Sequence, residues 1–136
     1  MGYRTDGLTF NTLRQANLQR IPTFRNAKGE ETDHSKWGLC QWLTAVCGEL
    51  GEAANLIKKI ERGDFTLDEA RAELAKELAD TQTYLDLLAH AAGINLGRAT
   101  IEKFNEVSKR IGSPVYIGYD GDWHLWAPAP KEESDG

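Results

Sequence analysis

Apolar residues recur at every third or fourth position along most of the chain, a spacing typical of helices that pack on one side. The pattern predicts four of them, over residues 8–20, 35–61, 67–92 and 96–111. Residues that stop helices follow each one, namely Pro22, Gly63, Gly93 and Gly112. Thr66 and Glu69 have the three-residue spacing of a capping box at the start of the third helix.

The pattern changes after the fourth helix. Residues 115–126 are rich in β-formers and contain two glycines, which favours a short strand or hairpin. Residues 127–136 combine prolines with charged side chains and are predicted to be disordered. A chain of 136 residues is the length of one domain. We therefore expect a single all-α domain over residues 1–126, a helical bundle of about four helices with a short irregular or β-like C-terminal tail.

Two pairs of carboxylates stand among apolar neighbours on the two longest predicted helices. Glu49 and Glu52 are three residues apart, and so are Glu77 and Asp80. Helical residues at this spacing project from one face. Because the two helices are joined by a short turn, we expect them to run antiparallel and to bring the pairs opposite each other. Gly48 and Gly51 lie on the same predicted helix as Glu49 and Glu52. Glycine is unfavourable inside a helix, so its presence there indicates that another group approaches the backbone closely.

Four carboxylates facing one another cannot all stay ionised without a cation between them. Ligands that are all oxygen suit Mg²⁺ or Mn²⁺. A di-iron site is disfavoured, because no histidine lies three residues after any of these acids, Glu49, Glu52, Glu77 and Asp80. The alternative for each acid is a solvated surface position paired with a nearby lysine or arginine.

The same residues resemble the signature of the MazG-like, all-α nucleoside triphosphate pyrophosphatases. Their pattern is ExxE, then 24 residues, then ExxD, and here it covers residues 49–52 and 77–80. Residues 10–17, 48–59 and 103–108 are similar to the helices of a phage and bacterial subgroup of that superfamily. The resemblance spans about residues 8–113, and four matching segments in the same order make it specific.

The resemblance implies hydrolysis of a nucleoside triphosphate to the monophosphate and pyrophosphate. It implies that Mg²⁺, with Mn²⁺ as a substitute, is held by Glu49, Glu52, Glu77 and Asp80, and that Glu49 or Glu52 also orients the attacking water. The subgroup implies purine substrates, with (d)GTP ahead of (d)ATP. No Ser/His/Asp nucleophile is apparent in the sequence, and metal-activated water needs none.

Substrate contacts are predicted from charge, hydrogen-bonding capacity and helical position. Lys59 lies seven residues after Glu52, near the same helical line, and Trp42 lies seven before Glu49, where it could stack on a base or belong to the core. The full set of predicted substrate-binding residues is Lys59, Lys103, Asn105, Asn17, Asn55 and Trp42.

Charge and oligomeric state complete the expectations. The formal net charge of −5 disfavours nucleic acid and anionic membranes as partners. The sequence contains no apolar run long enough to predict a membrane span or a signal peptide. The two cysteines are spaced too far apart on one helix to form a disulfide. A cytoplasmic location is therefore expected. The family resemblance implies a homodimer or homotetramer. A non-catalytic helical interaction or adaptor protein is the alternative function.

Overall fold

The computed structural model describes residues 7–126 and confirms an all-α fold with a small β-like element at its end. The chain divides into two compact units between Ile94 and Asn95. The predicted disordered segment, residues 127–136, lies outside the described residues. The elements are the helices α1 (Phe10–Arg20), α2 (Leu39–Glu61), α3 (Leu67–Ala91) and α4 (Leu96–Ile111) and the strands β1 (Val115–Ile117) and β2 (Trp123–Leu125).

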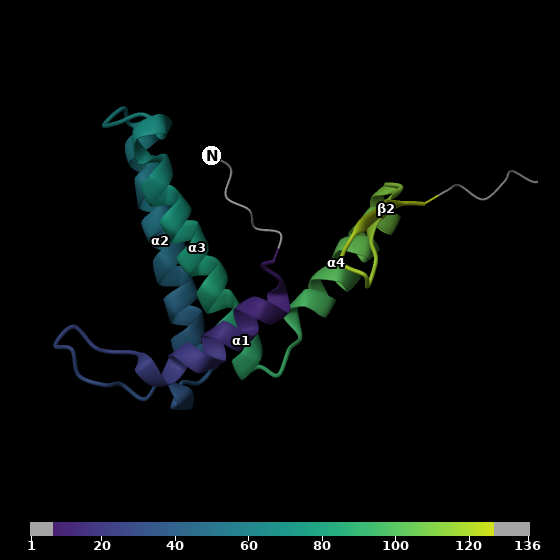
Figure 1. Ribbon diagram of the computed structural model, residues 1–136. Helices are drawn as coiled ribbons and strands as arrows, with labels where there is room; N and C mark the ends of the chain where they lie inside the picture. Colours follow the sequence, from purple (N-terminus) through teal and green to yellow (C-terminus); the bar gives the residue numbers. More distant parts are fainter. Residues whose placement is uncertain (1–6, 127–136) are drawn as a thin grey trace, which may run out of the picture. The chain divides into compact units, whose positions relative to one another are not determined.

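Helices α2 and α3 form a long antiparallel hairpin, the main body of the first unit (Figure 1). Gly63, with a φ of 84°, allows the turn between them. The predicted capping box starts α3: the Thr66 hydroxyl accepts from the Glu69 amide at 3.3 Å, and the Glu69 carboxylate accepts from the Thr66 amide at 2.8 Å. The short turn and the cap therefore fix where the two helices face each other.

Helix α2 begins at Leu39, four residues later than predicted. Residues His34–Lys36 form a separate 3₁₀ turn, capped by the Asp33 side chain. Gly38 separates the two with an extended backbone, and its amide donates to the Gln41 side chain at 2.9 Å. The break places Trp37 between two helical segments.

Residues in the contact between α2 and α3 alternate at spacings of four and three, as in a coiled-coil seam. The seam positions are buried or half-buried. On α2 they are Trp42, Val46, Glu49, Ala53, Leu56 and Ile60, and on α3 they are Ala70, Leu74, Glu77, Thr81, Tyr84 and Leu88. Two acids, one from each helix, thus occupy seam positions that an apolar side chain would ordinarily fill.

The apolar core lies at the N-terminal end of α2, where α1 crosses the hairpin (Figure 1). Its most buried members are Ile21, Trp42 and Leu87. Half-buried side chains pack around them, namely Leu18, Phe24, Trp37, Tyr84 and Leu88. The core therefore joins the α2–α3 hairpin to α1 and to the segment after it, which contains the 3₁₀ turns Ile21–Thr23 and His34–Lys36.

Helix α1 is attached to α3 by a charged cluster as well as by the core. Asp86 is 1 % exposed, and its carboxylate accepts two hydrogen bonds from Arg14 Nε, at 3.0 and 3.1 Å, and one from Asn17 Nδ2 at 3.0 Å. Arg14 Nη2 also donates to the Ile94 carbonyl at 3.3 Å. Asn17 is the only α1 residue that is fully buried. Polar bonds thus supply much of the specificity of this contact.

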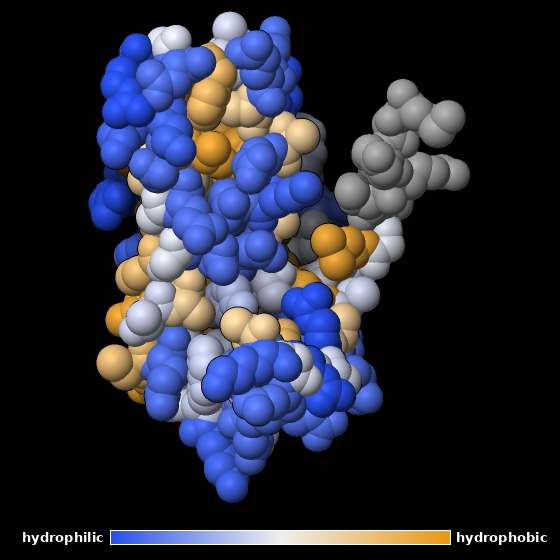
Figure 2. All heavy atoms as spheres, turned by 90° about the vertical axis from the view of Figure 1, so that its left-hand side faces the viewer, coloured by the Kyte–Doolittle hydropathy of each residue, from blue (hydrophilic) through white to orange (hydrophobic). Residues whose placement is uncertain are grey.

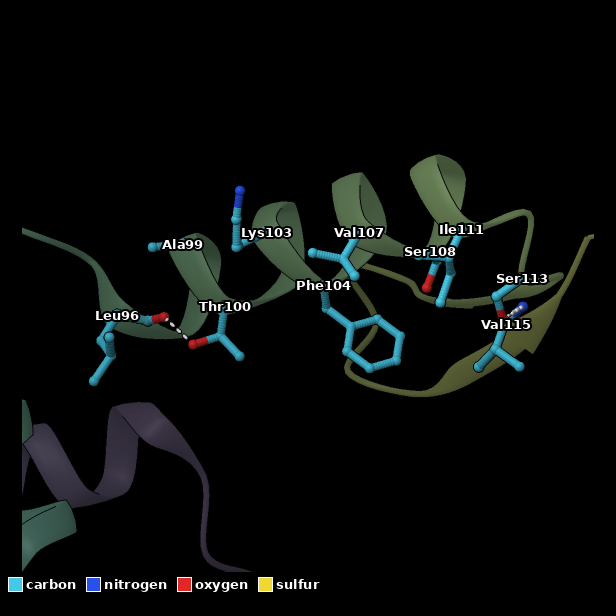
Figure 3. A pocket seen from close by; sticks show the side chains of 10 residues that line it. All are labelled: Leu96, Ala99, Thr100, Lys103, Phe104, Val107, Ser108, Ile111, Ser113 and Val115. Atoms are coloured by element: carbon cyan, nitrogen blue, oxygen red, sulfur yellow. Dashed lines mark hydrogen bonds between the residues drawn. The ribbon is translucent and has the colours of Figure 1, made fainter.

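The second unit consists of α4 and a two-stranded antiparallel hairpin, in which Tyr116 pairs with His124. Gly112 ends α4 in the left-handed conformation, at φ 71°. Asn105 joins the hairpin to α4, since its side chain donates to the Ile117 carbonyl and accepts from the Ile117 amide, both at 2.8 Å. Phe104, Val107 and Val115 line an open apolar pocket of this unit (Figure 3).

Large apolar side chains remain exposed on the first unit. On α2 they again follow spacings of four and seven, at Leu39, Leu43, Leu50 and Ile57, and so form one apolar stripe. On the face seen in Figure 2, apolar side chains interrupt a largely hydrophilic surface. Among residues 7–126, no helix combines the length and the hydropathy that crossing a membrane requires.

Candidate metal centre

Three of the four predicted acidic ligands meet in the middle of the α2–α3 hairpin. Glu49, Glu52 and Glu77 each place a carboxylate oxygen within 4.8 Å of the other two. Glu49 and Glu77 are half-buried at the seam, whereas Glu52 is exposed on the face of α2 that borders the seam. The set combines two ligands held by packing with one that reaches the site from solvent, and its all-oxygen chemistry fits Mg²⁺ or Mn²⁺.

The crowding of these acids changes their acidity. Partial burial, together with the hydrogen bonds and the charges of Glu52 and Glu49, raises the pKa of Glu77 from 4.5 to about 7. Burial also raises the pKa of Glu49, assisted by the charges of Asp80 and Glu52. In the absence of a cation, one proton is therefore shared within the cluster near neutral pH.

Asp80, the fourth predicted ligand, lies beside the cluster and outside the set of three that meets within 4.8 Å. Its charge acts on Glu49, whose pKa it raises, and on Tyr84, whose pKa is raised by burial and then by Glu49 and Asp80. Asp80 and Tyr84 are four residues apart on α3, so they share one face. The phenol of Tyr84 thus borders the acids on the side of the apolar core.

One side of α2 carries both the exposed ligand and two predicted substrate contacts. Positions along this side alternate at spacings of four and three, so that their side chains form one row. We call this row the α2 polar stripe; it consists of Gln41, Ala45, Gly48, Glu52, Asn55 and Lys59. It is distinct from the seam and from the exposed apolar stripe. Asn55 and Lys59 therefore lie on the side of the carboxylate cluster that faces solvent.

Two predicted substrate contacts have structural roles instead. Trp42 is 3 % exposed and packs against Trp37 and Tyr84, with ring centroids 4.7 and 6.2 Å apart, so its indole has no free face for a base. The Asn17 amide donates to Asp86 and to the Thr83 carbonyl, at 3.0 and 3.4 Å, inside the α1–α3 contact. Each side chain is thus used by the fold, which for Trp42 is the core position given above as its alternative, and substrate binding by either residue stays a prediction.

The other two predicted contacts belong to the second unit. The Asn105 side chain binds the backbone of Ile117, which gives it a structural role, and its contact with substrate stays a prediction. Lys103 is exposed and pairs with Glu106 at 2.7 Å, three residues along α4. An exposed pair of this kind exchanges readily with solvent, so Lys103 keeps its charge available within its own unit.

The glycines near the cluster are not required by packing within this chain. A Cβ built on Gly48 or Gly51 would meet no atom within 4 Å. Both lie inside a regular helix, where glycine is about 1 kcal/mol less favourable than alanine. The expected close approach is thus not made by any described part of this chain.

Two features of the structure were not predicted from the sequence. Asp86 stands between Leu85 and Leu87 at a buried helical position, and an acid there indicates a buried partner, which proves to be Arg14. Trp37 falls in no helical pattern, yet it borders a pocket with Cys40, Gln41, Thr44 and Ala45. Both could be recognised by asking which polar or aromatic residues break the expected periodicity.

Comparisons with known proteins add no assignment: no family model matches this chain, and no significant match to a curated protein or a solved structure was found.

The shifted acidity of the cluster predicts a pH-dependent response to metal. Folding raises the pKa of Glu77, so the stability that its protonated form contributes is present at low pH and is lost as the pH rises through about 7. A bound divalent cation takes the place of that proton. We expect the increase in melting temperature caused by excess Mg²⁺ or Mn²⁺, measured against EDTA by scanning calorimetry, to be larger at pH 8 than at pH 5.5. A metal effect that is the same at both pH values would contradict this, and Glu77→Gln should reduce the loss of stability that the metal-free protein shows between pH 5.5 and pH 8.

Proposed function

We propose that this protein is a metal-dependent nucleoside triphosphate pyrophosphohydrolase of the MazG-like, all-α superfamily, cleaving a (d)NTP to the (d)NMP and pyrophosphate. One observation carries the proposal: the carboxylates of Glu49, Glu52 and Glu77 converge within 4.8 Å across two helices, in the order and spacing that the family resemblance requires. The acidity shift of Glu77 supports it, because acids that repel one another are favourable only where a cation is bound.

Each carboxylate has a role in this proposal. Glu49, Glu52 and Glu77 hold Mg²⁺ or Mn²⁺, with Asp80 completing the charge around Glu49. The metal, when bound, supplies Lewis acidity to the phosphate oxygens and lowers the pKa of water. Glu52, the exposed member, accepts a proton from the attacking water, and half-buried Glu49, held by packing, helps to fix the position of the metal.

Positive charge on the α2 polar stripe completes the site. Lys59 lies seven residues from Glu52, about 10 Å along the helix axis, and Asn55 stands between them. This is the place for the β- and γ-phosphates, whose charge Lys59 offsets and whose oxygens the Asn55 amide can bind. The preference for a purine, with (d)GTP ahead of (d)ATP, rests on the family resemblance alone.

The exposed apolar stripe of α2 supports an oligomer. Leu39, Leu43 and Leu50 are each at least half exposed, and Ile57 extends the row. A row of this length on one helix is typical of a surface that a second copy covers. We propose a homodimer or homotetramer; a monomeric mass in solution X-ray scattering at micromolar concentration would reject it.

The function is tested by a nucleotide panel. The full-length protein is incubated with each of the ribo- and deoxynucleoside triphosphates and Mg²⁺ or Mn²⁺, and the products are separated by ion-exchange chromatography. We expect a monophosphate and pyrophosphate in equal amounts, and no turnover in EDTA. Diphosphate with orthophosphate, or no turnover with either metal, would reject the proposal and favour the alternative of a helical interaction or adaptor protein.

A further inference from the structure

We propose that the pocket beside Trp37, at the N-terminal end of α2, binds the base of the nucleotide. The inference rests on the proposed function, which it extends from the metal and phosphates to the rest of the substrate. The pocket is lined by Trp37, Cys40, Gln41, Thr44 and Ala45, all from the first unit. A planar heteroaromatic ring is the class of ligand that its chemistry suits.

Trp37 forms a rigid aromatic wall of this pocket. Its indole packs against His34 and Trp42, with ring centroids 4.2 and 4.7 Å apart, and His34 packs edge-on against Phe24 at 4.7 Å. The ring is therefore held by the core, yet it is only half-buried and the remaining surface lines the pocket. A fixed aromatic surface binds a base at a small entropic cost, because the side chain does not have to be ordered first.

The polar groups of the pocket match the edge of a base. Gln41 Oε1 accepts from the Gly38 amide at 2.9 Å, which fixes the side chain and leaves its amide hydrogens as donors. The Thr44 hydroxyl donates to the Cys40 carbonyl at 2.8 Å, which leaves the oxygen lone pairs as acceptors. The pocket thus presents a fixed donor and a fixed acceptor beside an aromatic surface, as base recognition requires.

The pocket is connected to the metal cluster along the α2 polar stripe. Ala45 and Glu52 both belong to the stripe and are seven residues apart, about 10 Å along the axis. This length is comparable with that of an extended nucleotide from its α-phosphate to its base. Gly48 lies between them, and a Cβ added there would meet no atom within 4 Å, so the route is open to a sugar.

The order of groups along α2 then gives the direction of the substrate. Trp37 and Gln41 lie at one end, Glu52 in the middle, and Asn55 and Lys59 at the other end. The base lies toward the N-terminus of α2 and the terminal phosphates toward its C-terminus. This order explains why Trp42, which faces the seam, is not the stacking residue and Trp37 is.

The test compares two probes on the full-length protein. Isothermal titration calorimetry with Mn²⁺ measures the affinity for inorganic tripolyphosphate and for a purine α,β-methylene triphosphate, which is not hydrolysed. Ala45→Leu fills the pocket without removing a core contact, and Ala72→Leu, on the exposed side of α3, is the matched control. We expect Ala45→Leu to weaken nucleotide binding about tenfold, the size of one stacking contact, and to leave tripolyphosphate binding unchanged. Ala72→Leu should change neither affinity.

A second pair of variants keeps the test decisive if one of them folds poorly. Trp37→Phe retains an aromatic ring and should keep the nucleotide affinity within about threefold, whereas Trp37→Leu should lose it. Equal affinity of the wild-type protein for the nucleotide and for tripolyphosphate would overturn the inference. So would an Ala45→Leu variant that binds both probes less tightly, or one that binds the nucleotide with wild-type affinity. If the wild-type protein hydrolyses nucleotides but these variants behave like it, only the base pocket fails. If it binds nucleotides through the pocket but does not hydrolyse them, only the proposed reaction fails.

Discussion

Glu52→Gln is expected to fold normally and to lose metal-dependent hydrolysis. Glu52 is exposed, and glutamine has nearly the same shape, so the α2–α3 hairpin should keep its stability. The substitution removes one of three converging carboxylates and with it a charge that holds the metal. Metals in such sites supply several kcal/mol of transition-state stabilisation, and each 1.36 kcal/mol is tenfold in rate. We therefore expect turnover to fall about 100-fold or more.

The control for this variant is Glu61→Gln, which neutralises an exposed acid at the end of the same helix and should retain full activity. Circular dichroism melting reports the fold, and Mn²⁺ titration followed by electron paramagnetic resonance reports the metal. Loss of activity with loss of Mn²⁺ binding and an unchanged melt is the expected set of results. A Glu52→Gln variant that hydrolyses triphosphates at the wild-type rate would reject the metal assignment, and an adaptor protein would tolerate the change at all four acids.

Arg14→Met is expected to cause the largest loss of stability of any charged-residue substitution considered. It removes the guanidinium that pairs with Asp86 and leaves a carboxylate that is 1 % exposed with only Asn17 as a side-chain partner. Breaking a buried pair in this way typically costs about 3–5 kcal/mol. Urea denaturation should show a decrease of that size in the free energy of unfolding. Arg71→Met, which breaks an exposed pair with Asp68, should cost less than about 1 kcal/mol.

The double variant Arg14→Met/Asp86→Leu separates the charge from the packing. Replacing both members of a buried pair by apolar residues of similar volume is often neutral or stabilising, since no charge is left buried without a partner. We expect the double variant to recover most of the stability that Arg14→Met loses. If it is as unstable as the single variant, the contact between α1 and α3 depends on the hydrogen bonds that Arg14 donates to the Asp86 and Ile94 carbonyls and that Asn17 donates to the Asp86 carboxylate, rather than on the compensation of charge.

Elements governed by local periodicity were predicted well from the sequence. The predicted bounds of α4 coincide with those observed, and the capping box of Thr66 and Glu69 forms as expected. The start of α2 was predicted four residues too early, because the 3₁₀ turn His34–Lys36 was included in the helix. Gly38, with an extended backbone, separates that turn from α2 and caps the start of the helix, a break that the spacing of apolar residues does not reveal.

The structural roles of Trp42 and Asn105 were not predictable from the sequence for one shared physical reason. Trp42 lies on the side of α2 that bears Glu49, as predicted. That side faces α3, so a side chain there is both near the acids and buried in the contact between the two helices. Asn105 was judged by its own helix, whereas its partner is the backbone of Ile117, twelve residues away. The sequence gives the angle of a side chain about its helix; what that angle faces depends on tertiary packing.

Helix α2 presents three rows of side chains: the seam toward α3, the exposed apolar stripe and the polar stripe. Away from the carboxylate cluster, where Glu52 of the polar stripe meets Glu49 of the seam, substitutions on different rows touch different neighbours, and effects at sites without shared partners are close to additive. If the proposed base pocket and reaction hold, substitutions at Gln41, Thr44 and Ala45 would change the preferred nucleotide while the proposed metal ligands and the proposed oligomer surface stay unchanged. On such a helix, substrate preference would evolve through single substitutions that keep both the activity and the fold.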